Sequence, residues 1–244
     1  MECTNTLKRS HTMSKPGKLI VIANVKGGTG KSTLAVNLAG TAADQGKSVL
    51  IIDTDGPQFN AASWHAERFA SKIENVHCTQ ITTNTIQHVV PNFMKTYDYV
   101  IVDSGARDTN VMRSAMIAAG LHKGVLLIPL TTSQFDAWAS IDTLGLLQEV
   151  KSIVDTKAFF LLNRIITGTK LENEFKDTLS EFESKYTIPS LKSHIHQRVD
   201  MINCLKTGLS VIEINRKGEA ANEITTLFNE INDFFTATDA IKGE

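Results

Sequence analysis

A glycine-rich loop between an apolar run and a helical pattern is the feature that most restricts how this chain folds. It lies in VIANVKGGTGKSTLAVNLAG, residues 21–40, and contains three glycines and two lysines. An apolar strand that leads through such a loop into a helix is the setting of a phosphate-binding loop, in which backbone N–H groups close around phosphate oxygens. The stretch therefore predicts an α/β fold with an anion site at the start of the first long helix.

The rest of the chain repeats this alternation of short apolar runs and helical patterns. Most of the runs lack polar alternation, which is typical of strands in a parallel sheet that is buried on both faces. We expect strands at 18–24, 48–53, 76–81, 99–103, 124–129, 158–163 and, with a weaker pattern, 191–195. The fold class that follows is an open, twisted, mostly parallel sheet with helices on both faces, which binds its ligand at the carboxyl ends of the strands.

Length and composition fit one domain. The 244 residues are 42% hydrophobic and 21% charged, which suffices for a sizeable core, and the formal net charge is -1. We expect a flexible extension at 1–17, a single domain at 18–236 and a short tail at 237–244. The three cysteines are widely spaced, and no apolar run approaches the roughly 20 residues of a membrane span. These features predict a cytoplasmic protein.

Residue chemistry assigns roles within the loop. The three glycines shape the cradle, because a Cβ would obstruct the approach of the backbone to phosphate oxygens. Lys31 supplies positive charge to the β and γ phosphates, and the Ser32 hydroxyl is placed to ligate Mg²⁺. The start of the helix adds the positive end of its dipole, and Thr33 can reach the α phosphate.

The other lysine of the loop, Lys26, has no role in this scheme. KGGTGKST, residues 26–33, resembles the deviant Walker A motif of the ParA/MinD superfamily of ATPases, and the resemblance covers almost the whole chain. It implies ATP and Mg²⁺ as cofactors, and a Lys26 that reaches across a nucleotide-sandwich dimer to the partner's phosphates, as an arginine finger does elsewhere. The nucleotide-binding residues that it implies are Lys26, Gly27, Gly28, Thr29, Gly30, Lys31, Ser32, Thr33, Asn163 and Arg164.

Three carboxylates follow strand ends. IIDTDGPQFN resembles the family's DxDPQ element, with one extra residue, Gly56, before the proline. The resemblance implies that one carboxylate touches the magnesium shell and that Asp55 orients the attacking water. YDYVIVDSGARD ends a strand on Asp103 in the form of a Walker B segment, whose carboxylate can hold a magnesium-bound water. The metal set that we expect is Ser32, Asp53 and Asp103, and the catalytic set is Lys26, Lys31 and Asp55.

Further segments add to the resemblance. LLIPLTTSQFDAW is similar to the family's strand, proline and SxxD segment, and FLLNR ends on Asn163 and Arg164, which in relatives contact the adenine and flank the nucleotide. HIHQRVDMINCLKTGLSVIEI is similar to the closing segment. Arg107 and Asp108 either form a local ion pair or touch ligand. The histidines of the closing segment, at strand spacing, are interpreted as one solvated or interface face.

These motifs together imply a small ParA-type ATPase that dimerises on ATP and positions or segregates cargo. The cargo would be a plasmid, a chromosome or a protein assembly, and a ParB-like or cargo-adaptor protein would stimulate slow hydrolysis. The resemblance also implies sequence-independent DNA binding by the ATP dimer and hence association with the nucleoid. The cations that could contact DNA are Lys151, Lys157, Lys170, Lys176, Lys185, Lys192, Arg198, Lys206, Arg216 and Lys217.

Three alternatives remain open. A MinD-like, membrane-associated regulator would carry basic residues beside the apolar face of its last helix. This chain has Glu223, Glu230 and Asp233 there, so no membrane contact is expected. A redox relative such as the nitrogenase iron protein would need cysteines at strand-end loops, whereas Cys78 lies in an expected strand. A ParA-like factor of conjugative DNA processing would share the same motifs.

Overall fold

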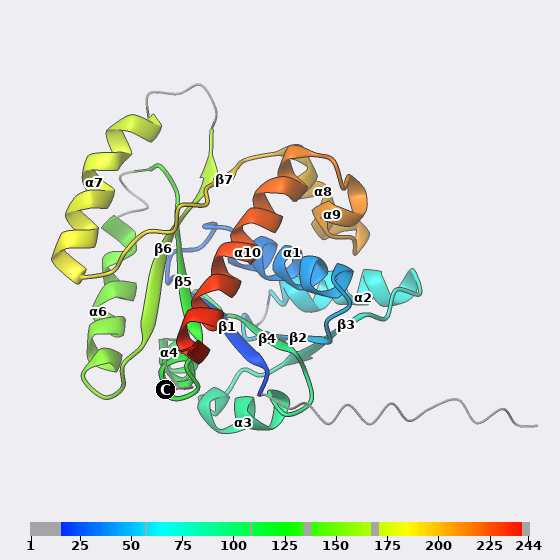
Figure 1. The fold of residues 1–244 in the computed structure, drawn as a ribbon, viewed down its shortest axis with the longest axis horizontal. Coiled ribbons are helices and arrows are strands. Elements are labelled where there is room, and N and C mark those ends of the chain that lie inside the picture. Colours follow the sequence, from blue (N-terminus) through cyan, green and yellow to red (C-terminus); the bar gives the residue numbers. More distant parts are fainter. Residues whose placement is uncertain (1–15, 57, 108, 134–137, 167–170, 241–244) are drawn as a thin grey trace, which may run out of the picture.

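A computed structural model describes residues 16–56, 58–107, 109–133, 138–166 and 171–240 of the chain. Within this part, seven strands form one sheet in the order β3-β2-β4-β1-β5-β6-β7, and every neighbouring pair is parallel (Figure 1). The strands are β1 (Lys18–Ile22), β2 (Val49–Asp53), β3 (Val76–Gln80), β4 (Tyr99–Asp103), β5 (Val125–Leu130), β6 (Lys157–Ile165) and β7 (Ile195–His196). The expected open parallel sheet is confirmed.

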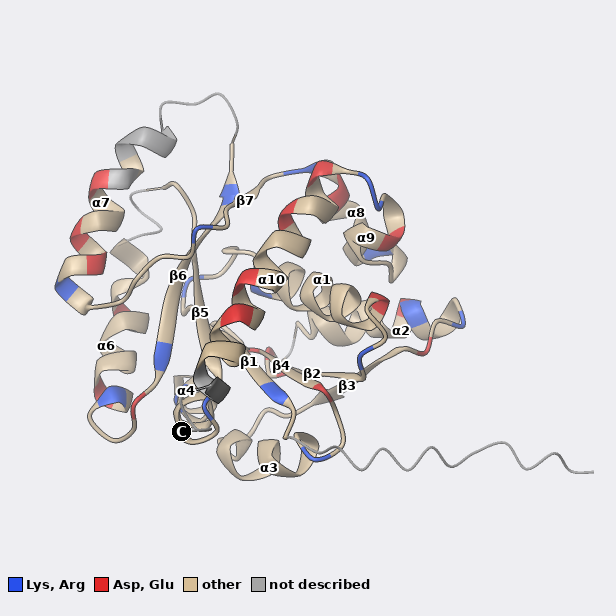
Figure 2. Cartoon of the chain, in the orientation of Figure 1, with Lys and Arg blue, Asp and Glu red and all other residues tan. Residues whose placement is uncertain are grey.

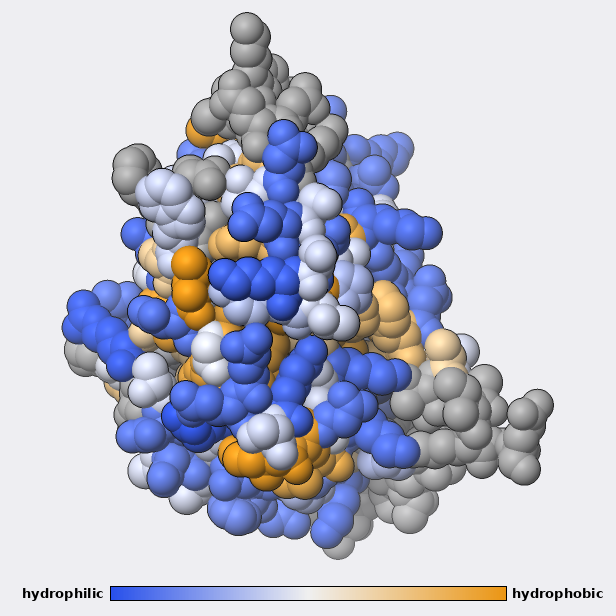
Figure 3. Space-filling model, turned by 90° about the vertical axis from the view of Figure 1, so that its left-hand side faces the viewer, coloured by the Kyte–Doolittle hydropathy of each residue, from blue (hydrophilic) through white to orange (hydrophobic). Residues whose placement is uncertain are grey.

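Helices cover both faces of the sheet because successive strand residues point to opposite sides. The helices are α1 (Lys31–Asp44), α2 (Asn60–Ala70), α3 (Ile86–Phe93), α4 (Thr109–Leu121), α6 (Ile141–Lys151), α7 (Leu171–Tyr186), α8 (Val199–Thr207), α9 (Val211–Ile214) and α10 (Glu219–Ala240). In β1, Ile20 and Ile22 belong to the hydrophobic cluster that includes α1, α2, α8, α9 and α10, whereas Leu19 and Val21 belong to the cluster that includes α3, α4, α6 and α7. The outer face over α6 and α7 is mostly hydrophilic, with small apolar areas (Figure 3).

The first and last helices follow their sequence patterns. α1 buries its apolar positions and ends before Gly46, whose φ of 74° is the left-handed conformation that favours glycine. α10 buries its stripe against the sheet, including Ile224, Leu227 and Phe228.

No helix among the described residues is long and apolar enough to cross a membrane.

The seventh strand differs from the sequence prediction. We expected 191–195, but β7 comprises Ile195–His196. The backbone N–H groups of Lys192 and Ser193 donate to the carboxylate of Glu230 at 2.8 and 2.9 Å. Ser190 forms an isolated parallel bridge with Phe160 of β6, and Leu191 N donates to Phe160 O at 2.9 Å. Glu230 of α10 then accepts the next two backbone N–H groups, so the pairing with β6 is interrupted until Ile195.

Candidate functional site

The loop between β1 and α1 has the backbone of an anion cradle at the carboxyl edge of the sheet. Gly28 and Gly30 adopt φ values of 79° and 87°, in the left-handed region. A Cβ on Gly30 would lie 2.4 Å from Asn163 Nδ2, whereas a Cβ on Gly27 would meet nothing within 4 Å. The loop therefore needs glycine where it touches β6 and is open where it faces the cavity.

Polar side chains from other elements hold this loop in place. Asn24, the second residue after β1, donates to Ser140 Oγ at 2.9 Å and accepts from Lys26 N at 2.9 Å. From β6, Asn163 Nδ2 donates to Thr29 O at 2.7 Å, and Arg164 Nη1 donates to Gly28 O. Asn24 was not among the predicted site residues, although a polar residue that ends an apolar run just before a glycine loop is a usable signal.

Lys31 lies beneath the cradle. Its side chain is buried, and Nζ donates to the carbonyl oxygen of Lys26 at 3.1 Å. Burial lowers the pKa of Lys31, and the negative charges of Asp103 and Asp55 act in the opposite direction. An incoming phosphate would supply the further negative charge that this partly compensated ammonium group lacks.

Two buried carboxylates stand side by side at the ends of β2 and β4, where Asp53 and Asp103 are register partners. Asp53 accepts N–H groups from Asp55 at 3.0 Å and from Ala62 at 2.9 Å, so it fixes the loop that carries Asp55. Burial raises the pKa of Asp53, and the backbone N–H groups of Ala62 and Asp55 oppose that rise. Its direct ligation of a metal stays a prediction.

Asp103 is the second of the two buried carboxylates at the strand ends. Both of its carboxyl oxygens are fully buried, and neither has a hydrogen-bond partner among the described residues. Burial raises its pKa to about 7, Asp53 adds to the rise, and Ser32 and Lys31 oppose it. An unpartnered buried carboxylate beside a hydroxyl suits a hard divalent cation such as Mg²⁺. Ser32 and Asp103 would hold that ion.

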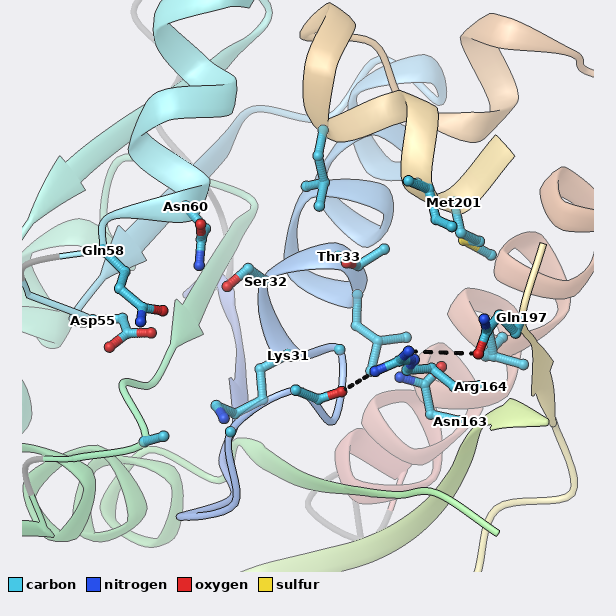
Figure 4. A pocket seen from close by; sticks show the side chains of 18 of the residues that line it. Lys31, Ser32, Thr33, Asp55, Gln58, Asn60, Asn163, Arg164, Gln197 and Met201 are labelled. Atoms are coloured by element: carbon cyan, nitrogen blue, oxygen red, sulfur yellow. Dashed lines mark hydrogen bonds between the residues drawn. The ribbon is translucent and has the colours of Figure 1, made fainter. Parts of the chain in front are cut away.

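These groups surround a pocket of about 560 Å³. Asp55, Gln58 and Asn60 lie on one side of the start of α1, and Asn163, Arg164, Gln197 and Met201 lie on the other (Figure 4). The segment of Gln197 and Met201 also contributes the apolar side chains of Ile195, Ile202 and Leu205 to the lining, next to the polar His196 and Arg198. Phosphates in the central cradle would thus leave the apolar side chains of α8 for a base at one end and polar groups for hydrolysis at the other.

Most of the predicted site residues meet in this pocket. The members that line it are Gly27, Gly28, Gly30, Lys31, Ser32, Thr33, Asp55, Asn163 and Arg164. Lys26 and Thr29 belong to the loop without lining the pocket, and Asp53 and Asp103 lie buried at its base. Arg107 is exposed at the pocket, whereas Asp108, Pro57 and most of the SxxD segment lie outside the described residues.

In the closing segment, interpreted from the sequence as one solvated or interface face, His196 pairs with an acid of α10. His196 Nδ1 lies 2.8 Å from Glu223 Oε1, and the backbone N–H of His196 donates to the same carboxylate. The apolar wall that α8 gives to the pocket was also missed, because Met201 and Leu205 look like ordinary core positions when only the sequence is known. A residue pattern alone does not say which ligand a helix will face.

The fold and the site define a P-loop nucleotide-binding domain. A family model, the CobQ/CobB/MinD/ParA nucleotide binding domain, matches residues 20–211, and the chain belongs to this family. The chain is 25% identical over 219 residues to the maintenance of carboxysome distribution protein A of Halothiobacillus neapolitanus, over 87% of this chain and 95% of that protein. It is 55% identical to the sporulation initiation inhibitor protein Soj of Bacillus subtilis, over 47 residues and 18% of that protein.

Solved structures share the fold across nearly the whole chain. The ATP complex of a Cyanothece McdA variant is 18% identical, has a TM-score of 0.69, and matches over 91% of this chain and 97% of its own. MinD of Pyrococcus horikoshii, complexed with Mg-ADP, is 17% identical with a TM-score of 0.67, over 88% of this chain and 96% of its own. At these identities the likeness concerns the fold.

Replacement of Gly30 by alanine tests the cradle. We expect Gly30→Ala to lose stability by about 1–2 kcal/mol, because the left-handed backbone disfavours a Cβ, and to weaken nucleotide binding as the loop moves away from Asn163. Urea unfolding and fluorescent-ADP titration measure the two effects. Gly145→Ala, on α6 with nothing within 4 Å of its added Cβ, is the control. Unchanged binding by Gly30→Ala would contradict this account of the loop.

Proposed function

We propose that the chain is a ParA-type ATPase that binds ATP with Mg²⁺, dimerises on ATP and positions a cargo. The observation that carries the proposal is the KGGTGKS loop folded over buried Lys31, with the unpartnered carboxylate of Asp103 beneath it. The relatives agree with this proposal, since the match to the carboxysome distribution protein extends over 95% of that protein.

The geometry supports separate roles for the pocket residues during hydrolysis. Lys31 and the backbone of the loop would hold the β and γ phosphates, and Mg²⁺ between Ser32 and Asp103 would supply charge stabilisation. Asp55 lies at the polar end of the pocket, where it would orient water for attack on the γ phosphate. Phosphoryl transfer requires positioning and electrostatics more than covalent chemistry, so this set of groups suffices.

Dimerisation would add the second lysine. Lys26 stands at the start of the loop without lining its own pocket, and its carbonyl oxygen accepts from Lys31. Its ammonium group would neutralise phosphate charge in the partner subunit. A partner protein, ParB-like or a cargo adaptor, would stimulate slow hydrolysis and so dissolve the dimer.

Among the cargo classes we favour a protein assembly. The relatives named for chromosome partitioning match only short stretches, such as 44 residues of the chromosome-partitioning ATPase Soj of Thermus thermophilus, whereas the protein named for maintenance of carboxysome distribution matches almost end to end. Cellular positioning would then use the nucleoid as a track, which requires sequence-independent DNA binding by the ATP dimer.

Ion pairs reduce the number of lysines and arginines that could contact DNA. Among the described residues, Lys and Arg are scattered over many elements of the ribbon and do not gather at one place in this view (Figure 2). Arg198 pairs with Glu219 and Glu223, and Arg216 pairs with Asp44, so neither arginine carries uncompensated charge. Lys206 is exposed at the end of α8 and is the better DNA contact.

DNA binding by the trapped dimer tests the proposed function. Asp55→Ala should retain ATP, because its cradle is intact, and should bind unrelated DNA duplexes with similar affinity. Fluorescence anisotropy across a salt series should give a slope of about -0.9 per phosphate neutralised. Lys206→Glu should reduce both the affinity and the slope. The nucleotide-free protein is the control, and absence of binding to any duplex at low salt would favour a protein scaffold as the track.

A further inference from the structure

The two ends of the nucleotide pocket are joined by contacts that lie away from the pocket itself. α2 follows the loop of Asp55 at the polar end, and α8 supplies Met201 and Leu205 to the apolar end. Beyond the pocket, α2 packs against α8 and against the turn between α8 and α9 (Figure 1).

Arg68 of α2 is the centre of the contact. Its side chain is fully buried, Nη1 donates to Gly208 O at 2.9 Å, and Nη2 donates to Glu213 Oε1 at 2.7 Å. Nη1 also donates to the other oxygen of Glu213 at 3.0 Å, which completes a two-pronged ion pair of fixed orientation. One turn earlier on α2, Trp64 Nε1 donates to Leu209 O at 3.1 Å.

At Gly208, the residue that ends α8, the chain comes close to the backbone of α2. Gly208 has a φ of 67°, and a Cβ on it would lie 2.4 Å from the backbone nitrogen of Arg68. Burial would raise the pKa of Glu213, but hydrogen bonds from Arg68 and Ser210 hold that pKa below its usual range. The ion pair is therefore intact at neutral pH, and the contact resists sliding of one helix past the other.

α2 is attached to the Asp55 end of the pocket, and α8 is attached to the helix that follows the phosphate loop. Asp53 accepts from Ala62 N in the first turn of α2 and from Asp55 N, so α2 and Asp55 share one anchor. On the other side, Asn37 of α1 donates to Cys204 Sγ of α8 at 3.3 Å. α8 thus has an attachment to the phosphate-loop helix that does not involve α2.

We propose that Arg68 is a positioning residue that couples the base end of the pocket to the hydrolytic end. A base that packs against α8 fixes α8, the Arg68 and Trp64 contacts transmit this restraint to α2, and the first turn of α2 then holds Asp55 in place. The inference rests on nucleotide binding, as the proposed function does, but it requires neither the dimer nor DNA.

Hydrogen exchange with ADP in EDTA tests the coupling, because this probe lacks both the γ phosphate and the metal that could contact Asp55 directly. In the wild-type protein, saturating ADP should slow amide exchange in α8 and also in residues 60–70 of α2, the latter by about fivefold or more. In Arg68→Lys, ADP should still protect α8, but protection of α2 should fall to less than half.

Two further variants make the result decisive. Trp64→Phe keeps an aromatic ring but removes the bond to Leu209 and part of the buried indole, so it carries the test if Arg68→Lys does not fold, with the same loss of α2 protection expected. Arg113→Lys, at the surface ion pair with Glu149, is the matched control and should exchange as the wild type does.

Full α2 protection in Arg68→Lys or in Trp64→Phe, or no α2 protection in the wild type, would overturn the coupling. Calorimetric titration of ADP separates this outcome from loss of binding, which would instead count against the nucleotide site.

Discussion

Lys31→Ala is expected to abolish nucleotide binding and ATP hydrolysis. Lys31 is buried beneath the loop, and no other lysine or arginine of the described lining is both buried and below the cradle. Hydrogen bonds to charged groups contribute about 1.5–3 kcal/mol each, so loss of the contacts to two phosphates should weaken ATP binding by about 100-fold or more. Equilibrium titration with a fluorescent ATP analogue and a phosphate-release assay measure the two losses.

Lys26→Ala is the contrasting variant. The side chain of Lys26 does not line its own pocket, so monomeric ATP binding should remain largely intact while the ATP-dependent dimer fails to form. Light scattering with ATP and Mg²⁺ detects the dimer, and urea unfolding verifies that both variants are folded. A Lys26→Ala protein that dimerised normally would refute the assignment of this lysine to the partner's phosphates.

The parts of the site that the sequence could predict are those in which contiguous residues act together. The phosphate loop, the strand that ends on Asp103 and the start of α1 are local patterns, and the structure has each at the expected residues. Strand interiors were equally clear, because strands buried on both faces are continuously apolar. The expected ends at β1 and β4 fell within two residues of those observed.

Contacts between distant segments could not be predicted in this way. The bonds from Asn24 to Ser140 and from Arg68 to Glu213 join residues more than a hundred positions apart. Glu230 looked like a solvated acid on the outer face of α10, yet its carboxylate accepts the backbone N–H groups of Lys192 and Ser193 beside β6. Such choices depend on which segments the topology brings together, which no local pattern encodes.

Asp103 should destabilise the empty protein above neutral pH. Its pKa is about 7 in the folded state, raised by burial and by Asp53 from an ordinary value of 3.8. The folded state therefore binds a proton more tightly than the unfolded state does, and this contribution to stability is lost as the pH rises through the interval between the two values. A neutral side chain at this position would avoid the loss, but it would be a poorer ligand for Mg²⁺.

Asp103→Asn is thus expected to stabilise the nucleotide-free protein while it eliminates ATP hydrolysis. The gain in unfolding free energy over the wild type should be roughly 2–3 kcal/mol larger at pH 8 than at pH 5. Urea unfolding in EDTA at both pH values measures it. Asp142→Asn, at an exposed position of α6, is the control and should change stability by less than about 0.5 kcal/mol at either pH. If the gain from Asp103→Asn were the same at both pH values, the carboxylate would already be compensated in the empty protein, and the magnesium site would have to be sought elsewhere.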